Sequence, residues 1–455
     1  MTEPNLVSVD STEVFVSDRE FAGLISGLFN GEEPSNLAIA VSGGSDSMAL
    51  SLLTARWAKQ RKVSVTALTV DHQLRSEARS EAVQVASWMK SMGLAHQVLL
   101  WTGGAKVRCL AKSPQASARD ARLNLMTDWC RSNGAQHLLL GHNAEDQTET
   151  FLINLSRGSG VDGLASILSV SNRNNVHLLR PLLSIPRWRL EKTCSMYKQL
   201  WINDPSNLDN ASTRVRFRQS QAILESEGLT QNRLLNTVCH LARAKTALDY
   251  YVRSTLEASC RLSSCGTLEV DIESLIDTPA EIALRCMSRI LATVSGQVYG
   301  PRFESLRRAY DKFCSGDWRG QTLHGCRIER RVGVLVIYRE MGAIDHNCVI
   351  EPNAKVLWDN RFRISYAPNS KSFASINVSA LTSGEWSALK KVNNSDIKSF
   401  YGADQRQTVP IIRDSTGIVG VPVLGVWWPG TKESMKKAIS IAFDPPRALL
   451  PENNV

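Results

Sequence analysis

The sequence predicts an α/β fold in which a doubly wound, mostly parallel sheet is followed by a helical domain and a small β-rich C-terminal domain. Short apolar runs alternate with helical patterns through the first half of the chain, which is typical of a parallel sheet. Basic helical stretches come next, and short strands with turns fill the remainder. We therefore expect domains at 1–222, 223–340 and 347–445, with linkers near Gly228–Thr230 and Met341–His346.

The first predicted strand and helix flank a small polar loop in the segment LAIAVSGGSDSMALSLL, Leu37–Leu53. Leu37–Val41 is apolar without alternation, which predicts a strand covered on both faces, and the apolar residues from Met48 onward predict a helix. Gly43 and Gly44 permit close approach of the backbone to a ligand, and the N–H groups of a helix start attract phosphate. A plain helix cap is the alternative, because Ser, Asp and Gly are common cap residues.

The loop lacks the features of two common nucleotide-binding motifs. No lysine occurs between Ala38 and Ala58, so the loop is not a Walker motif, and G-x-G-x-x-G is absent as well. A phosphate loop without its own cation needs Mg²⁺ to balance the phosphate charge. Asp46 is the carboxylate that we expect to bind this ion.

Polar clusters also end the later predicted strands. We expect strands at Val63–His72, His96–Trp101, His137–His142 and Val176–Leu182, and helices at Ser80–Ser91, Ser117–Gly134 and Ala144–Gly158. In doubly wound sheets, ligands bind outside the carboxyl ends of the strands. The polar clusters at these ends are Ser42–Ser47, Asp71–His72, His142–Asp146 and Arg180. Their gathering at one edge favours a nucleotide site over a helix cap.

Two of the predicted helices carry further candidate residues. His142, Asp146 and Glu149 are spaced i, i+4 and i+7, so they share one helix face that could hold Mg²⁺ or orient a nucleophile. The alternative is a solvated helix start, where acidic residues are favoured by the dipole. Arg119 and Arg122 lie one turn apart and could bind phosphate, although a surface salt-bridge pair is the alternative.

Composition limits the class of protein. With 43% hydrophobic and 21% charged residues the chain is of ordinary globular composition, and its apolar runs fall far short of the ~18 residues of a membrane span. The N-terminus is polar and acidic, unlike a signal peptide. The ten cysteines form no C-x-x-C pair, which indicates a reduced, cytoplasmic protein. The net charge of +9 permits a polyanionic partner without requiring one.

The second half is less informative. The stretch Leu229–Leu262 has apolar residues at helical spacing and predicts an amphipathic helix pair, and Pro301–Phe313 predicts a further basic helix. Both could bind a nucleic-acid backbone or be ordinary amphipathic helices. Thr408–Trp428 predicts a hairpin with its turn at Asp414–Gly417.

Seven motifs, taken together and in order, resemble those of the tRNA(Ile)-lysidine synthases, a family of the N-type ATP pyrophosphatase (PP-loop) superfamily. The resemblance is dense over residues 37–218 and loose over 225–315 and 350–440. The motifs are SGGSDS, VDHQLR, QASARDAR, GHNAEDQTET, RGSGVDGL, LLRPLL and WINDPSNLDNASTRVRFR.

The resemblance implies a ligase that uses ATP as co-substrate together with Mg²⁺. ATP adenylates the carbonyl oxygen of the wobble cytidine in the CAU anticodon of tRNA(Ile) and releases pyrophosphate, and free L-lysine then displaces AMP to give lysidine. The alternatives are another PP-loop tRNA-modifying enzyme of the thiolase type and a non-catalytic RNA-binding protein on the same fold. A homodimer is left open.

The resemblance also assigns residues. It implies a catalytic role for Asp46, His142, Asp146 and Arg119, and ATP binding by Ser42, Gly43, Gly44, Ser45, Asp46 and Ser47, with Asp46 also the Mg²⁺ ligand. It implies substrate or tRNA contacts for Arg122, Glu145, Glu149, Arg180, Arg214 and Arg218. The sequence departs from the family at three positions, where Glu145 replaces an aspartate, Leu123 a tyrosine and Val215 an asparagine.

Overall fold

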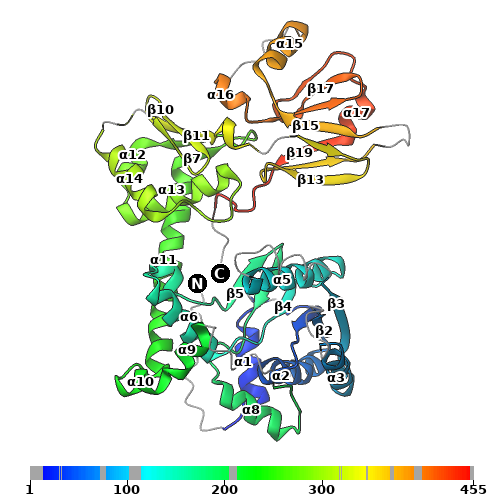
Figure 1. Ribbon diagram of the computed structural model, residues 1–455, viewed down its shortest axis with the longest axis vertical. Helices are drawn as coiled ribbons and strands as arrows, with labels where there is room; N and C mark the ends of the chain where they lie inside the picture. Colours follow the sequence, from blue (N-terminus) through cyan, green and yellow to red (C-terminus); the bar gives the residue numbers. More distant parts are fainter. Residues whose placement is uncertain are drawn as a thin grey trace. The chain divides into compact units, whose positions relative to one another are not determined.

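The computed structural model in Figure 1 divides into two compact units. One unit comprises Met1–Thr246 with Asn453–Val455, and the other comprises Ala247–Glu452. The structure describes residues 14–29, 31, 33–71, 78–101, 114–203, 213–316, 318, 320–344, 347–368, 374–393 and 402–450.

The first unit is built on a six-stranded sheet with the strand order β3-β2-β1-β4-β6-β5. The strands are β1 (Asn36–Ala40), β2 (Ser64–Asp71), β3 (Ala95–Leu100), β4 (His137–Leu139), β5 (Val170–Arg173) and β6 (Val176–Leu179). The neighbouring strands run parallel except β5, which forms an antiparallel hairpin with β6 at the sheet edge. The predicted fold class is confirmed, and β5 is an addition that the sequence did not predict.

Helices cover both faces of this sheet (Figure 1). They are α1 (Asp18–Ser26), α2 (Ser45–Arg61), α3 (Ala78–Ser91), α5 (Pro114–Ser132) and α8 (Arg187–Met196). Two further helices, α6 (Ala144–Ser156) and α7 (Val161–Leu164), follow β4. Along β1, Leu37 and Ile39 pack in a core with α1, α2, α3 and α8, whereas Ala38 and Ala40 pack in a second core with α5. Successive side chains of a strand point to opposite faces, so this division is that of a doubly wound sheet.

The first unit continues through α9 (Thr213–Gln219) and α10 (Gln221–Ser226) into α11 (Gln231–Ser259). The predicted helix pair over Leu229–Leu262 is wrong, because α11 is one continuous helix of 29 residues. Its first turns are fixed by packing of Leu234 and Val238 against Phe151 of α6. The boundary between the two units falls inside α11, and the division into three domains stays a prediction.

The second unit begins with an antiparallel sheet in the order β7-β8-β11-β10-β9. Its strands are β7 (Cys260–Leu262), β8 (Leu268–Asp271), β9 (Gly320–Leu323), β10 (Cys326–Arg330) and β11 (Val334–Arg339), and its helices are α12 (Ile272–Ile276), α13 (Ala280–Ser295) and α14 (Phe303–Cys314). The apolar side of α13 packs on this sheet. The predicted basic helix is confirmed as α14.

The rest of the second unit holds a five-stranded antiparallel sheet, β12-β15-β16-β17-β18, and a three-stranded one, β13-β14-β19. Their strands are β12 (Cys348–Ile350), β13 (Ala354–Trp358), β14 (Phe362–Tyr366), β15 (Ile376–Ala380), β16 (Pro410–Asp414), β17 (Gly417–Val421), β18 (Val426–Trp427) and β19 (Ile439–Phe443), with helices α15 (Ser383–Asn393), α16 (Ala403–Arg406) and α17 (Glu433–Ala438). The predicted hairpin is confirmed by β16 and β17. Asp414 Oδ1 shapes its turn by accepting hydrogen bonds from the N–H groups of Thr416 and Gly417.

A buried ion triad joins these sheets to the preceding one. Asp359 accepts hydrogen bonds from Arg339 of β11 at 3.0 Å and from Arg361 at 2.6 Å. Arg361 is fully buried, and burial lowers its pKa to about 10 although Asp359 opposes the shift. Over the described ranges, no helix has both the length and the apolar content required to cross a bilayer.

Candidate active site

The candidate site lies where the loops after β1 and β4 meet at the carboxyl edge of the parallel sheet. β1 pairs with β2 on one side and with β4 on the other, so the crossover direction reverses there, as at ligand sites of such sheets. Gly141 allows the two loops to approach, because a Cβ at this position would lie 3.2 Å from the carbonyl oxygen of Asp46. Of the other predicted clusters, Asp71 ends β2 and Arg180 follows β6, whereas His72 lies outside the described residues.

The loop between β1 and α2 leaves a helix start open. Gly43 has φ +89°, and a Cβ there would lie 2.8 Å from Ile202 Cδ1, so both the backbone conformation and the space require glycine. Gly44 is the N-cap of α2, and no side chain caps the first-turn N–H groups. Ser47 Oγ instead donates to Gly44 O and accepts from Ser42 N. This geometry argues against the plain helix cap, because the predicted cap residues do not cap.

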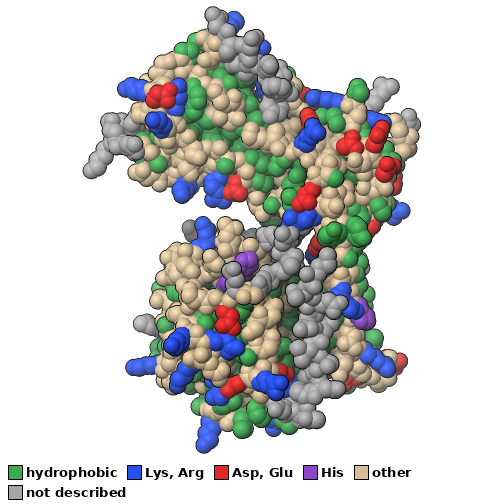
Figure 2. All heavy atoms as spheres, turned by 180° about the vertical axis from the view of Figure 1, so that it is seen from behind, with side chains coloured by type: hydrophobic (Ala, Val, Ile, Leu, Met, Phe, Trp, Pro, Cys, Tyr) green, Lys and Arg blue, Asp and Glu red, His purple; other side chains and the backbone are tan. Residues whose placement is uncertain are grey.

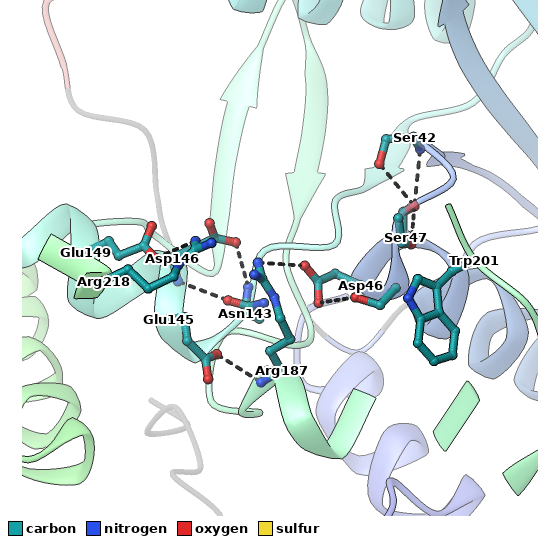
Figure 3. A network of polar contacts seen from close by, with 12 residues as sticks. Ser42, Asp46, Ser47, Asn143, Glu145, Asp146, Glu149, Arg187, Trp201 and Arg218 are labelled. Carbon is teal, nitrogen blue, oxygen red and sulfur yellow. Dashed lines mark hydrogen bonds and ion pairs between the residues drawn. The ribbon is translucent and has the colours of Figure 1, made fainter. Parts of the chain in front are cut away.

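Asp46 is held by a residue that the sequence did not single out. Figure 3 shows Arg187 between Asp46 and Glu145, with its Nη2 3.1 Å from Asp46 Oδ2. The backbone N–H of Arg187 donates to Glu145 Oε2 at 2.9 Å. Burial raises the pKa of Asp46 and nearby Asp146 adds to the rise, while Arg187 opposes it. The Asp46–Arg187 contact spans 141 positions of sequence, so no local pattern reveals it.

Asp146 has a structural task at the start of α6. Its carboxylate accepts a hydrogen bond from Asn143 N at 3.1 Å, and the Asn143 side chain accepts one from Asp146 N at 3.0 Å (Figure 3). This is a capping box. The alternative interpretation, in which acidic residues stabilise the helix start, therefore accounts for the contacts of Asp146 with Asn143. Asn143 is fully buried and was not predicted.

His142 is a neutral imidazole among arginines. Arg119 Nη2 lies 3.3 Å from His142 Nε2, and because arginine can only donate, Nε2 accepts and the ring proton is on Nδ1. Burial lowers the pKa of His142 to about 4. Asp146 raises this pKa, while Arg180, Arg119 and Arg214 lower it.

These arginines make the surroundings of His142 strongly positive. Burial lowers the pKa of Arg119, Arg122 and Arg180, and in each case a neighbouring guanidinium adds to the effect. Arg180 is 9% exposed and donates to Leu168 O and Ser171 Oγ. In the described part of the chain, none of these three arginines has a carboxylate oxygen within 4.0 Å. Unpaired guanidinium groups suit phosphate.

A pocket opens beside the start of α6, between α6, α9, α10 and α11. Its lining includes four leucines and three glutamates: Leu152, Leu224, Leu229, Leu234, Glu145, Glu149 and Glu225. Glu149 is 5% exposed, and its Oε1 accepts from Arg218 at 2.6 Å, while its Oε2 is buried and has no partner among the described residues. Burial raises the pKa of Glu149, and Arg218 opposes that rise.

The structure shows the surroundings of the three residues that depart from the family pattern. Glu145 binds the backbone N–H of Arg187, so the longer side chain reaches the start of α8. Leu123 is partly buried against the core under α5. Val215 is 8% exposed on α9, between Arg214 and Arg216, so an apolar residue suits this position.

The donor set is compatible with Mg²⁺ held jointly with phosphates, and not with a dedicated metal cage. Within the described residues there is no group of three or more His, Cys, Asp or Glu side chains able to hold a metal. Asp46 supplies one carboxylate beside the open helix start. Mg²⁺ commonly binds through one or two carboxylates and substrate phosphates, which is the mode that Asp46 fits.

Comparison with known proteins gives consistent matches. Residues 17–224 match the PP-loop domain family ATP_bind_3. The tRNA(Ile)-lysidine synthase of Wolbachia sp. subsp. Brugia malayi is 35% identical over 344 residues, covering 75% of this chain and 79% of that protein. That of Orientia tsutsugamushi is 31% identical over 425 residues, covering 91% and 94%. The solved structure of the U34-tRNA thiolase NcsA from Methanococcus maripaludis is 16% identical, covering 50% of this chain and 78% of that one, with a TM-score of 0.43.

Proposed function

The chain belongs to the tRNA(Ile)-lysidine synthase family, and from this premise we propose that ATP, the wobble cytidine and lysine meet at the sheet edge described above. The enzyme is a ligase that forms lysidine on tRNA(Ile) at the expense of ATP. The thiolase and the non-catalytic RNA-binding alternatives are not favoured. The observation that supports this placement best is the uncapped start of α2, which brings Asp46 to the edge where α6 begins.

In the adenylation step, the loop Ser42–Ser47 holds the pyrophosphate portion of ATP through backbone N–H groups and hydroxyls. Asp46 would hold Mg²⁺, which would supply positive charge to the phosphates. Arg119, Arg122 and Arg180 stabilise the charge that develops as the cytidine oxygen attacks the α-phosphorus and pyrophosphate leaves. These guanidinium groups lack carboxylate partners in the described part of the chain, so their charge is available to phosphate oxygens, although Arg180 is largely buried and already donates to Leu168 O and Ser171 Oγ.

For the second step, we assign free L-lysine to the pocket beside α6. The leucines of the pocket suit an aliphatic side chain, and Glu145, Glu149 and Glu225 suit an ammonium group. Asp146 accepts the proton of the attacking amine, which then bonds to the activated carbon of cytidine as AMP leaves. His142, being neutral, offers its Nδ1–H as a hydrogen-bond donor near the base without adding charge. Arg218, which lines the pocket, and Arg214, one turn before it on α9, are assigned to substrate contact.

The tRNA partner and the cellular location complete the proposal. Figure 2 shows Lys and Arg side chains spread over the visible face of each unit rather than gathered in one patch. Such a distribution is compatible with contacts to a long phosphate backbone at several places. We propose a cytoplasmic location, which is supported by the lack of any C-x-x-C pair among the ten cysteines of the sequence. A homodimer remains open.

The test is direct assay of the wobble nucleoside. Purified protein is incubated with a CAU-anticodon tRNA(Ile), ATP and isotope-labelled lysine, and the digested tRNA is examined by mass spectrometry. We expect a cytidine that carries the labelled lysine, together with equal amounts of AMP and pyrophosphate. A tRNA with uridine at the wobble position is the control. An unchanged cytidine, or a sulfur-containing nucleoside when a sulfur donor is added, would contradict the proposal.

A further inference from the structure

Arg187 lies among three carboxylates that come from two different helix starts. Its Nη2 contacts Asp46 at the start of α2, and its backbone N–H contacts Glu145 at the start of α6. Asp146 also interacts electrostatically with the guanidinium, and all three carboxylates raise the pKa of Arg187 against the effect of burial. A cation shared by these carboxylates therefore occupies the neighbourhood where the proposed function places Mg²⁺.

The Arg187 ion pair differs from the structural ion pair two residues away. Arg189 also lies in the first turn of α8, but its Nη2 is 2.7 Å from Glu20 Oε2, and only 4% of the Arg189 side chain is exposed. In the Arg187–Asp46 pair, 29% and 21% of the two side chains are exposed, so solvent and ions reach it. Arg187 Nε and Arg189 Nε are both buried without a partner among the described residues, so exposure is what distinguishes the two pairs. An accessible pair can be exchanged, whereas a sealed pair cannot.

We propose that Arg187 is a positioning residue that hinders Asp46 from binding a free divalent cation, so that Asp46 binds the cation that comes with ATP. In the nucleotide-free protein, the guanidinium neutralises Asp46 and competes with a free divalent cation for the carboxylate. When ATP arrives with its cation, the cation takes the carboxylate and the guanidinium binds a phosphate oxygen, using donors that are otherwise unused. This inference rests on the proposed role of Asp46, and it predicts that cation and nucleotide are bound together rather than in sequence.

The competition can be measured without turnover. We would titrate the nucleotide-free protein with Mn²⁺ and follow the free ion by electron paramagnetic resonance. Arg187→Met removes the competing charge and should bind Mn²⁺ on the order of tenfold more tightly than the unmodified protein, which corresponds to about 1.4 kcal/mol. Arg187→Lys keeps the charge and should remain close to the unmodified protein. Arg56→Met is the matched control, because Arg56 also forms an exposed pair, with Asp18, outside the site.

ATP binding supplies the second measurement. In the presence of Mg²⁺, Arg187→Met should weaken ATP binding in equilibrium dialysis by about tenfold, since a guanidinium–phosphate contact is lost. Opposite changes in Mn²⁺ and ATP affinity cannot result from a general loss of structure. Equal Mn²⁺ affinity in Arg187→Met and the unmodified protein would overturn the inference. Failure to form lysidine with an intact Mn²⁺ effect would instead count against the proposed function alone.

Discussion

Asn143 and Asp146 are joined by two reciprocal hydrogen bonds, in which the side chain of each residue accepts from the backbone N–H of the other. The pair fixes the first turn of α6, which carries Glu145 and Glu149 toward the pocket. A residue proposed to take a proton from lysine therefore also serves as a helix cap. Any substitution of Asp146 has to separate these two tasks.

Asp146→Asn separates them, because the amide oxygen can still accept the hydrogen bond from Asn143 while the charge is lost. We expect kcat/KM for lysine to fall by roughly 30- to 1000-fold, or about 2–4 kcal/mol, with a smaller change for ATP. Steady-state kinetics with each substrate varied in turn provide the measurement. Glu145→Gln is the comparison, because Glu145 lines the proposed lysine pocket and is the competing candidate for the contact with the lysine amine. Equal losses for lysine and ATP in Asp146→Asn would point to a role in cation binding.

Asp46→Ala should abolish pyrophosphate release while the fold is kept. The substitution removes the carboxylate at the open helix start, and the partly exposed Arg187 left behind can be solvated. Release of pyrophosphate from labelled ATP is the measurement, with circular dichroism as the check on folding. Near-normal release from a folded variant would remove Asp46 from the site.

The pKa of His142 predicts a pH dependence of stability. The folded-state pKa, about 4, lies below the ordinary value of 6.5, so between these values the unfolded chain binds more protons than the folded chain. The contribution of His142 is therefore fully present above pH 6.5 and is lost as the pH falls toward 4. NMR titration of the imidazole should give the low pKa and the Nδ1–H tautomer. Asp146→Asn should lower this pKa further, because Asp146 raises it.

Gly43→Ala should weaken ATP binding, because alanine is strained at φ +89° and its Cβ would meet Ile202. We expect a loss of roughly 1–2 kcal/mol of stability from the backbone conformation alone. Gly44→Ala is the matched control, since Gly44 has φ −72° and the nearest atom to its Cβ would be Ser42 Oγ at 3.8 Å. Urea denaturation and equilibrium dialysis with ATP measure the two effects. Equal behaviour of the two variants would contradict the assigned loop geometry.

Asp359→Asn should destabilise the second unit by about 3–5 kcal/mol, because two buried guanidinium groups lose their shared counter-charge. Asp444→Asn is the control, since its ion pair with Arg363 is about half exposed, and we expect a change below about 1 kcal/mol. Urea unfolding monitored by tryptophan fluorescence gives both values. A small effect for Asp359→Asn would show that the two arginines find other partners.

The sequence predicted the parallel sheet because its strands are continuous apolar runs, a pattern that burial on both faces imposes. It missed β5, since Val170–Arg173 is mostly polar and lies at the sheet edge. The error at α11 was avoidable, because Gln231–Ser259 contains neither glycine nor proline and nothing in it marks a break between helices.

In the candidate site too, local sequence patterns revealed some residues, whereas residues that depend on contacts far along the chain were missed. The residue types of the loop at Gly43 and Gly44 left a plain helix cap as an alternative, and the polar clusters at the ends of the other predicted strands were needed to favour a nucleotide site. Arg187 was missed because its partner lies on another element far along the chain, and its own surroundings resemble an ordinary first turn. Sequence spacing predicted that His142, Asp146 and Glu149 share one helix face, but α6 begins at Ala144 and His142 precedes its N-cap, so only Asp146 and Glu149 lie on the helix. The spacing also did not separate the capping contact of Asp146 from a role in chemistry.

The buried ion triad of Arg339, Asp359 and Arg361 limits how the chain after Met341 can be recombined with that of a relative. Arg339 belongs to the sheet that precedes the junction at Met341–Ala343, whereas Asp359 and Arg361 follow it. A chimera joined at that junction would inherit the arginine from one parent and its counter-charge from the other. Exchanging the segment after the junction therefore preserves stability only between parents that both carry the triad. We expect the segments before and after the junction to have been inherited together.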